Sequence, residues 1–322
     1  MKKTYTFLGD DFVGDYIVSC LDQAGYEFVE EIEKARYIFS YYLFPQETDE
    51  AYFSEEGIFP FIQPGSHLIN LSTLGISVIE TAAQMAQIEG FYFVDAPLMT
   101  AELRHQRSYT NHESIMIAVG AKQESFEEVA PVLEHIAAKV IYAGLPGKAQ
   151  ALKGATTIML ASQAQALCEA WGYMRTCHDI SKNYCIDDER SNSNLDESLD
   201  TLTLLAQDLG LMSFASVQLF DLLRGAHLNK GLYLRILVGD CFGALASLED
   251  ENTSLPQFEA VLALFRLILL AAPEEASCAA LGFFYKDAKS AEQYGFNWKE
   301  AFEVLGSPQD EEELLSEDEM QP

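Results

Sequence analysis

Short apolar runs alternate with amphipathic segments through the first half of the chain. The runs at residues 4–8 and 67–70 are each followed by a helical pattern, at residues 13–24 and 76–89 respectively. Further strands are expected at residues 26–29, 37–43, 91–95, 114–119 and 139–142, with another helix at residues 125–137. Strands that alternate with helices build parallel sheets, so the pattern predicts an α/β fold with a Rossmann-like doubly wound parallel sheet.

The pattern changes at residues 144–157. The glycines and the proline of residues 144–147 predict a loop, and a long helix is predicted from residue 148 to about residue 174, where Ala, Leu, Met and Gln dominate. Helical periodicity returns at residues 199–209, 212–224, 232–248, 256–271 and 284–294. We therefore expect a Rossmann-like domain at residues 1–147, an all-helical domain at residues 148–306 that begins with this long helix, and an acidic mobile tail at residues 307–322.

Composition narrows the range of partners. The chain has 322 residues, 49% of them hydrophobic, which is enough for a large core. Its formal net charge of −30 repels phosphate backbones and anionic lipids, so neither nucleic acid nor a membrane is an expected partner. Six cysteines without paired spacing, and no export signal, indicate a reduced cytoplasmic protein. Cys177, His178 and Cys185 lie close together but lack a fourth ligand, so no metal site is expected.

The turn after the first expected strand resembles a dinucleotide fingerprint, and it reads Gly9-Asp10-Asp11-Phe12-Val13-Gly14. The first and last glycines of that motif are present, but Asp11 replaces the middle one, which normally lets the backbone approach a pyrophosphate. A carboxylate there adds bulk and like charge, so we expect weakened phosphate binding. Glu30 stands where an acidic residue would hold a ribose, or it is a solvated charge. Only about seven residues separate the second expected strand from the third, too few for the usual crossover helix.

Two other groups of residues could carry chemistry. Lys153 and Thr157 lie four residues apart on one face of the long helix, within reach of a shared ligand. A solvated surface lysine is the alternative. Arg104, His105 and Arg107 concentrate potential cations in one loop, and they could bind an anionic substrate or only neutralise the acidic chain's own field.

Taken in order, these segments resemble the β-hydroxyacid dehydrogenases, the family of 3-hydroxyisobutyrate and 6-phosphogluconate dehydrogenases. The residues that carry the resemblance are Gly9 to Gly14, Leu43-Phe44-Pro45, Asn70-Leu71-Ser72-Thr73, Asp95-Ala96-Pro97, Val119-Gly120, Gly144 to Lys153 and Lys286-Asp287. The resemblance implies hydride transfer between a nicotinamide cofactor, NAD or NADP, and a small hydroxy acid or related carbonyl. It implies that Lys153 relays the hydroxyl proton, and that the chain forms a homodimer through its helical domain.

The resemblance also assigns the surrounding site. It implies that the cofactor is bound by Gly9, Asp11, Phe12, Val13, Gly14, Leu43, Phe44, Ser72, Thr73 and Asp287, and that the substrate is bound by Pro97, Met99, Thr100, Thr157 and Lys286. Several positions depart from the family pattern. The serine and two glycines of its substrate loop are Met99, Thr100 and Ala101 here, and its helix asparagine is Thr157.

These departures leave two main alternatives. One is a divergent dehydrogenase that retains Lys153 and prefers NAD, because Glu30 is present. The other is a non-catalytic binding or regulatory protein that keeps the scaffold without the cofactor. An open cleft between Gly9 and Lys153 would favour the enzyme, whereas packed side chains between them would favour the scaffold.

Overall fold

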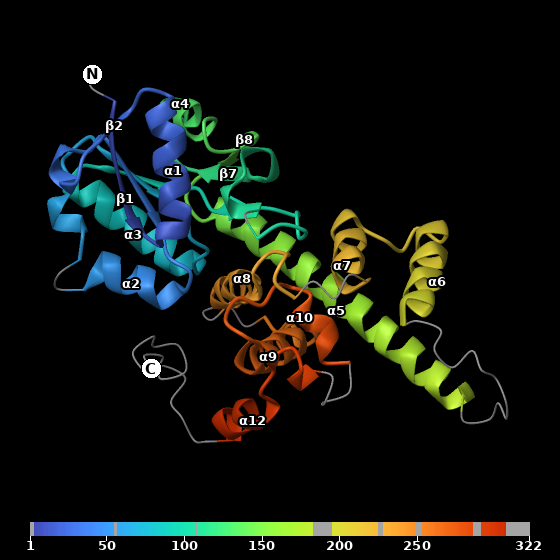
Figure 1. Cartoon of the computed structure of the whole chain (residues 1–322). Helices are drawn as coiled ribbons and strands as arrows, with labels where there is room; N and C mark the ends of the chain where they lie inside the picture. The colour runs from blue at the N-terminus through green and yellow to red at the C-terminus, as the bar shows by residue number, and fades with distance from the viewer. Residues whose placement is uncertain are drawn as a thin grey trace.

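The computed structural model describes residues 3–54, 57–106, 108–182, 195–224, 228–248, 253–285 and 291–306. An eight-stranded sheet lies in the first half of the chain (Figure 1). Its strands are β1 (Thr4–Gly9), β2 (Glu27–Phe28), β3 (Tyr37–Tyr41), β4 (His67–Asn70), β5 (Tyr92–Asp95), β6 (Leu98–Met99), β7 (Met116–Gly120) and β8 (Lys139–Gly144). The predicted strands are all present, with ends that differ by a few residues, and β6 is additional.

Two directions of pairing occur in the sheet. Strands β2, β1, β3, β4 and β5 are parallel neighbours in that order. Strand β7 is antiparallel to β5 and to β6, and β8 runs parallel to β7. The sheet is therefore predominantly parallel, as expected, with antiparallel pairing of β7 at one end. The reason is that β5 continues through Ala96 and Pro97 into β6 along the same side of β7, so the chain returns in the opposite direction.

The second strand-helix unit is shortened, as the spacing predicted. Strand β2 contains two residues and pairs with β1 alone. A single 3-10 turn, η1 (Ile32–Lys34), replaces the crossover helix before β3. Glu30 is exposed beside this turn, and Glu31 forms an ion pair of 2.7 Å with Lys34.

Helices cover both faces of the sheet and build the second half of the chain (Figure 1). The helices are α1 (Asp11–Gln23), α2 (Pro45–Phe53), α3 (Ile76–Glu89), α4 (Gln123–Leu133), α5 (Lys148–Lys182), α6 (Leu195–Asp208), α7 (Phe214–Arg224), α8 (Leu234–Ala246), α9 (Pro256–Ala271), α10 (Ala280–Phe283) and α12 (Trp298–Gly306). Short 3-10 turns are η2 (Phe59–Phe61), η3 (Ser108–Thr110) and η4 (His112–Ser114). The sequence pattern did not predict α2, and the helix expected at residues 284–294 includes residues outside the described ranges. The expected tail at residues 307–322 also lies outside them.

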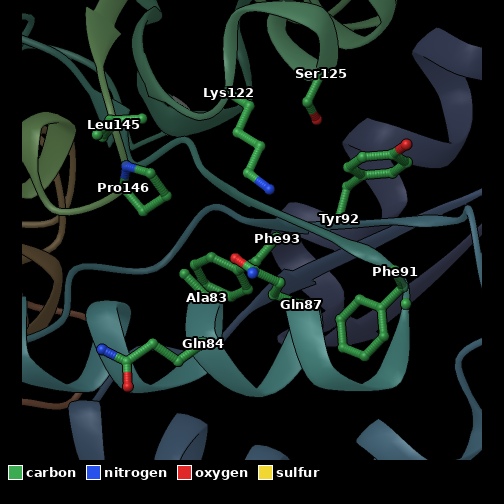
Figure 2. A pocket seen from close by; sticks show the side chains of 11 residues that line it. Ala83, Gln84, Gln87, Phe91, Tyr92, Phe93, Lys122, Ser125, Leu145 and Pro146 are labelled. Atoms are coloured by element: carbon green, nitrogen blue, oxygen red, sulfur yellow. The ribbon is translucent and has the colours of Figure 1, made fainter.

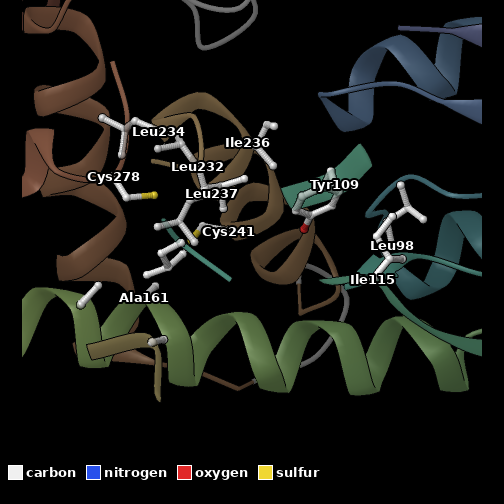
Figure 3. Packing of buried hydrophobic residues seen from close by; sticks show 14 of the residues in the cluster. Leu98, Tyr109, Ile115, Ala161, Leu232, Leu234, Ile236, Leu237, Cys241 and Cys278 are labelled. Carbon is white, nitrogen blue, oxygen red and sulfur yellow. The ribbon is translucent and has the colours of Figure 1, made fainter. Parts of the chain in front are cut away.

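The sheet and the helical region share one hydrophobic core. Leu98, Tyr109 and Ile115 from the sheet region belong to the same buried cluster as Leu237 and Cys241 of α8 (Figure 3). A second cluster lies on the other face of the sheet, where α2 and α3 cover β3, β4 and β5. On one side of the start of α5, Ala149, Gln150 and Lys153 are buried in this interior. Within the described ranges, none of the helices combines the length and the apolar character that a bilayer crossing requires.

Candidate functional site

The start of α5 is held to the carboxyl ends of β4 and β5 by a buried carboxylate. Asp95 Oδ2 accepts from the backbone N–H of Gly147 at 3.0 Å and of Gln150 at 3.3 Å, and Oδ1 accepts from Gln150 Nε2 at 2.9 Å. Gln150 Oε1 in turn accepts from the N–H of Leu74 at 3.1 Å. Burial raises the pKa of Asp95 to about 7, although these hydrogen bonds act in the opposite direction. These hydrogen bonds of Asp95 and Gln150 fix the direction of α5 relative to the sheet.

One turn further along α5, Lys153 is enclosed in a polar cluster. Its side chain is 3% exposed, and its Nζ donates to Asp240 Oδ2 at 2.5 Å and to the Tyr109 hydroxyl at 2.6 Å. The Tyr109 hydroxyl donates to the same carboxylate oxygen at 2.5 Å, and Thr73 Oγ1 donates to Asp240 Oδ1 at 2.6 Å. Asp240 therefore accepts from three side chains, contributed by α5, by η3 and by the loop after β4. Thr157 is buried one turn later on the same face of α5.

Tyr109 enters this cluster as a neutral phenol. Burial, reinforced by the nearby Asp240 carboxylate, raises the pKa of Tyr109 well above its ordinary value. Its hydroxyl is directed toward α5 (Figure 3), and its ring lies 6.5 Å from the ring of Tyr41, at the end of β3. Tyr109 therefore keeps its proton, which its hydroxyl donates to the Asp240 carboxylate.

The backbone of the first glycine turn has the geometry of a dinucleotide fingerprint. Gly9 has a φ of +110°, and a Cβ there would lie 1.9 Å from the carbonyl oxygen of Tyr41. A Cβ at Gly14 would lie 2.7 Å from the ring of Phe7. Gly9 therefore permits the tight turn, and Gly14 permits close packing of α1 on β1, which are two of the three roles that the fingerprint glycines have.

The carboxylates of the same turn, Asp10 and Asp11, disfavour the binding of a phosphate. Asp10 is the N-cap of α1, and its Oδ1 accepts from the N–H of Phe12 at 2.9 Å. Asp11 occupies the first helical position and is exposed. The side chain of Asp10 thus takes one donor at the helix start that could otherwise bind a pyrophosphate. The residues fit a dinucleotide in their backbone conformation, and the two carboxylates reduce the affinity expected for it.

Helix α8 packs directly on the edge of the sheet where the predicted cofactor residues lie. A Cβ at Gly239 would lie 2.6 Å from the Leu43 carbonyl oxygen, and one at Gly243 would lie 2.6 Å from that of Thr73. The ring of Phe12 contacts that of Tyr233, just before α8, with centroids 6.0 Å apart. The amine of Lys153 is therefore enclosed by α8 and by Tyr109 instead of facing an open cleft. This is the arrangement that favours the scaffold alternative.

Comparison with known sequences agrees with the fingerprint. Residues 11–144 match the family described as the NAD binding domain of 6-phosphogluconate dehydrogenase. YkwC, an uncharacterized oxidoreductase of Bacillus subtilis, is 26% identical over 130 residues, a match that covers 40% of this chain and 43% of YkwC. The aligned region thus spans less than half of that relative.

Two solved structures share the fold over most of the chain. The Mycobacterium tuberculosis 3-hydroxyisobutyrate dehydrogenase with L-serine is 16% identical, with a TM-score of 0.64 over 89% of this chain and 100% of that one. Psf3, in complex with NADP+ and 2-OPP, is 15% identical, with a TM-score of 0.65 over 87% of this chain and 99% of that one. Residues 11–144 are therefore similar to the NAD binding domain of 6-phosphogluconate dehydrogenase, and the chain shares the fold of these two structures.

The loop after β5, which the sequence resemblance compares with a substrate loop, is stabilised by contacts of its own. Pro97 is buried, while Met99 and Thr100 are partly exposed. Thr100 Oγ1 accepts from the N–H of Glu102 at 3.0 Å, so this hydroxyl stabilises its own loop. The predicted site residues Lys286 and Asp287 lie outside the described residues.

The remaining predicted cofactor residues are also engaged within the chain. Ser72 Oγ accepts from the N–H of Tyr42 at 2.9 Å, and the N–H of Phe44 donates to Glu47 Oε2 at 2.9 Å. Val13 is buried in the core beneath α1. The structure brings Ser72 and Thr73 to the same sheet edge as Gly9, because β1, β3 and β4 are parallel neighbours.

The cationic loop is at least partly neutralised from within. Arg104 Nε lies 3.2 Å from Glu102 Oε1, and the same carboxylate oxygen accepts from the Arg104 backbone N–H at 2.9 Å. Arg107 lies outside the described residues, and His105 is exposed. The contact at Arg104 agrees with the interpretation that this loop offsets the chain's own negative charge.

Sequence reasoning missed the partners of Lys153. Asp240 is the one acidic residue in α8, whose sequence is Leu-Arg-Ile-Leu-Val-Gly-Asp-Cys-Phe-Gly-Ala-Leu-Ala. A carboxylate in so apolar a helix is rarely buried without a cation, and this signal could have linked it to Lys153. Tyr109 offered no comparable signal, because aromatic residues are frequent throughout the chain.

Proposed function

We propose that the chain is an NAD(P)-linked oxidoreductase that acts on small hydroxy acids or the related carbonyls, with Lys153 as its proton relay. The observation that best supports the proposal is the position of Lys153. It stands where the sequence resemblance places the family's lysine, it lies at the junction of sheet and helices, and its amine donates hydrogen bonds to Tyr109 and Asp240.

In this proposal each residue of the cluster has a separate task. A bound nicotinamide would supply the acceptor or donor for the hydride. Lys153 Nζ holds the proton that passes to or from the substrate oxygen, and Tyr109 orients that amine by its hydrogen bond of 2.6 Å. Asp240 balances the charge while the cluster is buried.

Substrate access requires a movement of α8, because Lys153 is enclosed beneath that helix. Asp240 is part of α8, so the same movement separates the carboxylate from the ammonium and leaves Tyr109 in place. Closing restores the ion pair and removes water from the site, a role that moving elements commonly have in enzymes. The enclosed cluster would then be the resting state.

The first experiment measures nucleotide binding. We expect weak binding of both NADH and NADPH by fluorescence titration, with NADH tighter because the cations between β2 and β3, Lys34 and Arg36, are paired with Glu31 and Glu128. Asp11→Asn should tighten NADH binding several-fold, since removal of one charge near a phosphate relieves about 1 kcal/mol of repulsion in water. The matched control is Asp15→Asn, which removes an equal charge at another exposed position of α1 and should have a smaller effect.

The second experiment measures turnover. Oxidation of a panel of small 3-hydroxy acids is followed by NADH formation in the wild type and in the double variant Lys153→Met, Asp240→Asn, which leaves no unpaired charge in the interior. We expect the double variant to lose turnover and to keep its affinity for NADH. Lys148→Met, at an exposed position of the same helix, is the control. Full activity of the double variant would remove Lys153 from the mechanism.

A non-catalytic binding protein is the second candidate, and two observations favour it. Asp10 takes a donor at the start of α1, and packed residues enclose Lys153. Under this alternative neither nucleotide binds at about millimolar concentration, which is the weak end of specific affinity, and Asp11→Asn changes nothing.

Self-association and location complete the proposal. We propose a cytoplasmic homodimer formed through the helical region. Large apolar side chains that are more than half exposed gather on α6, on α7 and between them, at Leu204, Leu205, Leu209, Leu211 and Phe214. Exposed apolar side chains that lie this close in the chain favour an interaction site. Light scattering after gel filtration should give a mass of two chains, and Leu205→Glu combined with Leu209→Glu should give one.

A further inference from the structure

Strands β5 and β7 separate from each other at a part of the sheet away from the turn at Gly9. Strands β5 and β7 pair at a single position, Asp95 with Gly120, and beyond Gly120 the chain leaves the sheet to begin α4. A pocket of about 300 Å³ lies in this opening (Figure 2). It is lined by Ala83, Gln84, Gln87, Gly90, Phe91, Tyr92, Phe93, Lys122, Ser125, Leu145 and Pro146. The volume is at the lower end of the range typical of small-molecule sites.

One wall of the pocket is built to receive negative charge. Lys122 is the N-cap of α4 and supplies no capping hydrogen bond, so the first N–H groups of this 11-residue helix lack a capping side chain. The partial positive charge of the helix start and the Lys122 ammonium therefore act on the same space. None of the lining residues is acidic, in a chain whose formal net charge is −30.

A buried hydroxyl on the same wall lacks a partner. Ser125 is 3% exposed, and its Oγ has no hydrogen-bond partner among the described residues. Figure 2 shows this hydroxyl and the Lys122 ammonium directed into the same space, beside Tyr92 and above Phe93. An unpaired buried hydroxyl costs free energy, roughly 1–3 kcal/mol, which a ligand that accepts its hydrogen bond would recover.

The opposite wall is flat and apolar. Tyr92 is 36% exposed, and its ring is stacked on the buried ring of His67, with centroids 4.8 Å apart and planes at 20°. The stacking holds the Tyr92 ring in place as one surface of the pocket. Ala83 and Pro146 add further apolar surface on the sides.

The geometry points to a binding site for a small organic anion, one phosphate or carboxylate group attached to a flat apolar body. The anionic group would lie against Lys122, the Ser125 hydroxyl and the start of α4, and the apolar body would lie on Tyr92. The pocket shares no residue with the predicted dinucleotide site, so the inference does not depend on the proposed oxidoreductase function.

The test uses three probes and isothermal titration calorimetry on the full chain. Phenyl phosphate has both parts of the expected ligand, inorganic phosphate has only the anion, and benzyl alcohol has only the apolar body. We expect phenyl phosphate to bind at least about tenfold tighter than either of the others, because each part alone makes one set of contacts. No binding of phenyl phosphate at about 10 mM would overturn the proposal.

Variants place the binding in this pocket. Lys122→Met should weaken phenyl phosphate binding about tenfold, and Ser125→Ala about threefold without lowering the Tm, since the hydroxyl has no partner in the folded chain. Ala83→Leu should abolish binding by filling the pocket. Lys139→Met removes the same charge from an exposed position at the start of β8 and is the control. Binding that is unchanged in Lys122→Met and Ser125→Ala, or that falls equally in Lys139→Met, would contradict the assignment.

Discussion

The substitution Asp95→Asn should remove the part of the pH dependence of stability that comes from the Asp95 carboxyl. In the unfolded chain the Asp95 carboxyl has its ordinary pKa of 3.8, whereas burial raises it to about 7 in the folded chain. Between these values the folded chain binds more protons at this site than the unfolded chain does. Folding at this site is therefore favoured at low pH, and its contribution to stability falls as the pH rises from about 4 to about 7.

The size of the effect follows from that difference in pKa. Each pH unit of difference corresponds to about 1.4 kcal/mol, so the wild type should lose about 4 kcal/mol relative to the asparagine variant over this interval. The asparagine has its own constant cost. Its amide group faces either Gln150 Nε2 or the N–H groups of Gly147 and Gln150, and one unpaired donor costs about 1–3 kcal/mol at every pH.

Urea unfolding followed by far-UV circular dichroism, at several values between about pH 4 and pH 8, measures the difference directly. We expect the wild type to be the more stable protein near pH 4 and the variant to gain on it steadily until about pH 7. Asp49→Asn, at an exposed position of α2, removes an equal charge and controls for the acidic surface. A difference between wild type and Asp95→Asn that stays constant with pH, or that changes in the opposite direction, would refute the reasoning.

Three further outcomes are expected. Lys153→Met alone leaves the Asp240 carboxylate buried without its cation and should lower the free energy of unfolding in urea by about 3–5 kcal/mol. Adding Asp240→Asn should restore most of this loss. Equal losses in the single and double variants would contradict the ion pair. Gly243→Val places a side chain against Thr73 and should lower the Tm by several degrees in calorimetry. An unchanged Tm would contradict the packing of α8 on the sheet edge. Burial lowers the pKa of His67 to about 4, so between about pH 4 and 6.5 the unfolded chain binds more protons than the folded chain, and stability rises with pH. His67→Phe should remove about 3 kcal/mol of this rise in urea unfolding. An unchanged pH dependence in the variant would argue against a buried neutral imidazole.

Local patterns were sufficient to predict most of the fold. The expected strand at residues 67–70 and the helices at residues 76–89 and 256–271 match β4, α3 and α9 residue for residue. Their hydrophobic periodicity and their bounding glycines or prolines are local signals. The short connection after β2 also followed from spacing alone, because too few residues were available for a crossover helix.

What the sequence could not supply were contacts between distant segments. The reversed direction of β7 depends on how the loop at residues 100–115 returns to the sheet, and no periodicity records that. The position of Lys153 was predictable from its motif, but its pairing with Asp240 joins residues separated by 87 positions. Asp95 was expected at the start of a substrate loop, whereas in the structure its carboxylate holds the start of α5.

The distance along the chain between Lys153 and Asp240 has a consequence for biosynthesis. The lysine leaves the ribosome 87 residues before its counter-charge, an interval on the order of 10 s at ordinary translation rates. During that time the amine stays hydrated and the nascent N-terminal half lacks the surface of α8 that completes its core. A truncated product that ends before residue 240 should therefore require chaperones and fail to reach a native state, although it contains every strand of the sheet.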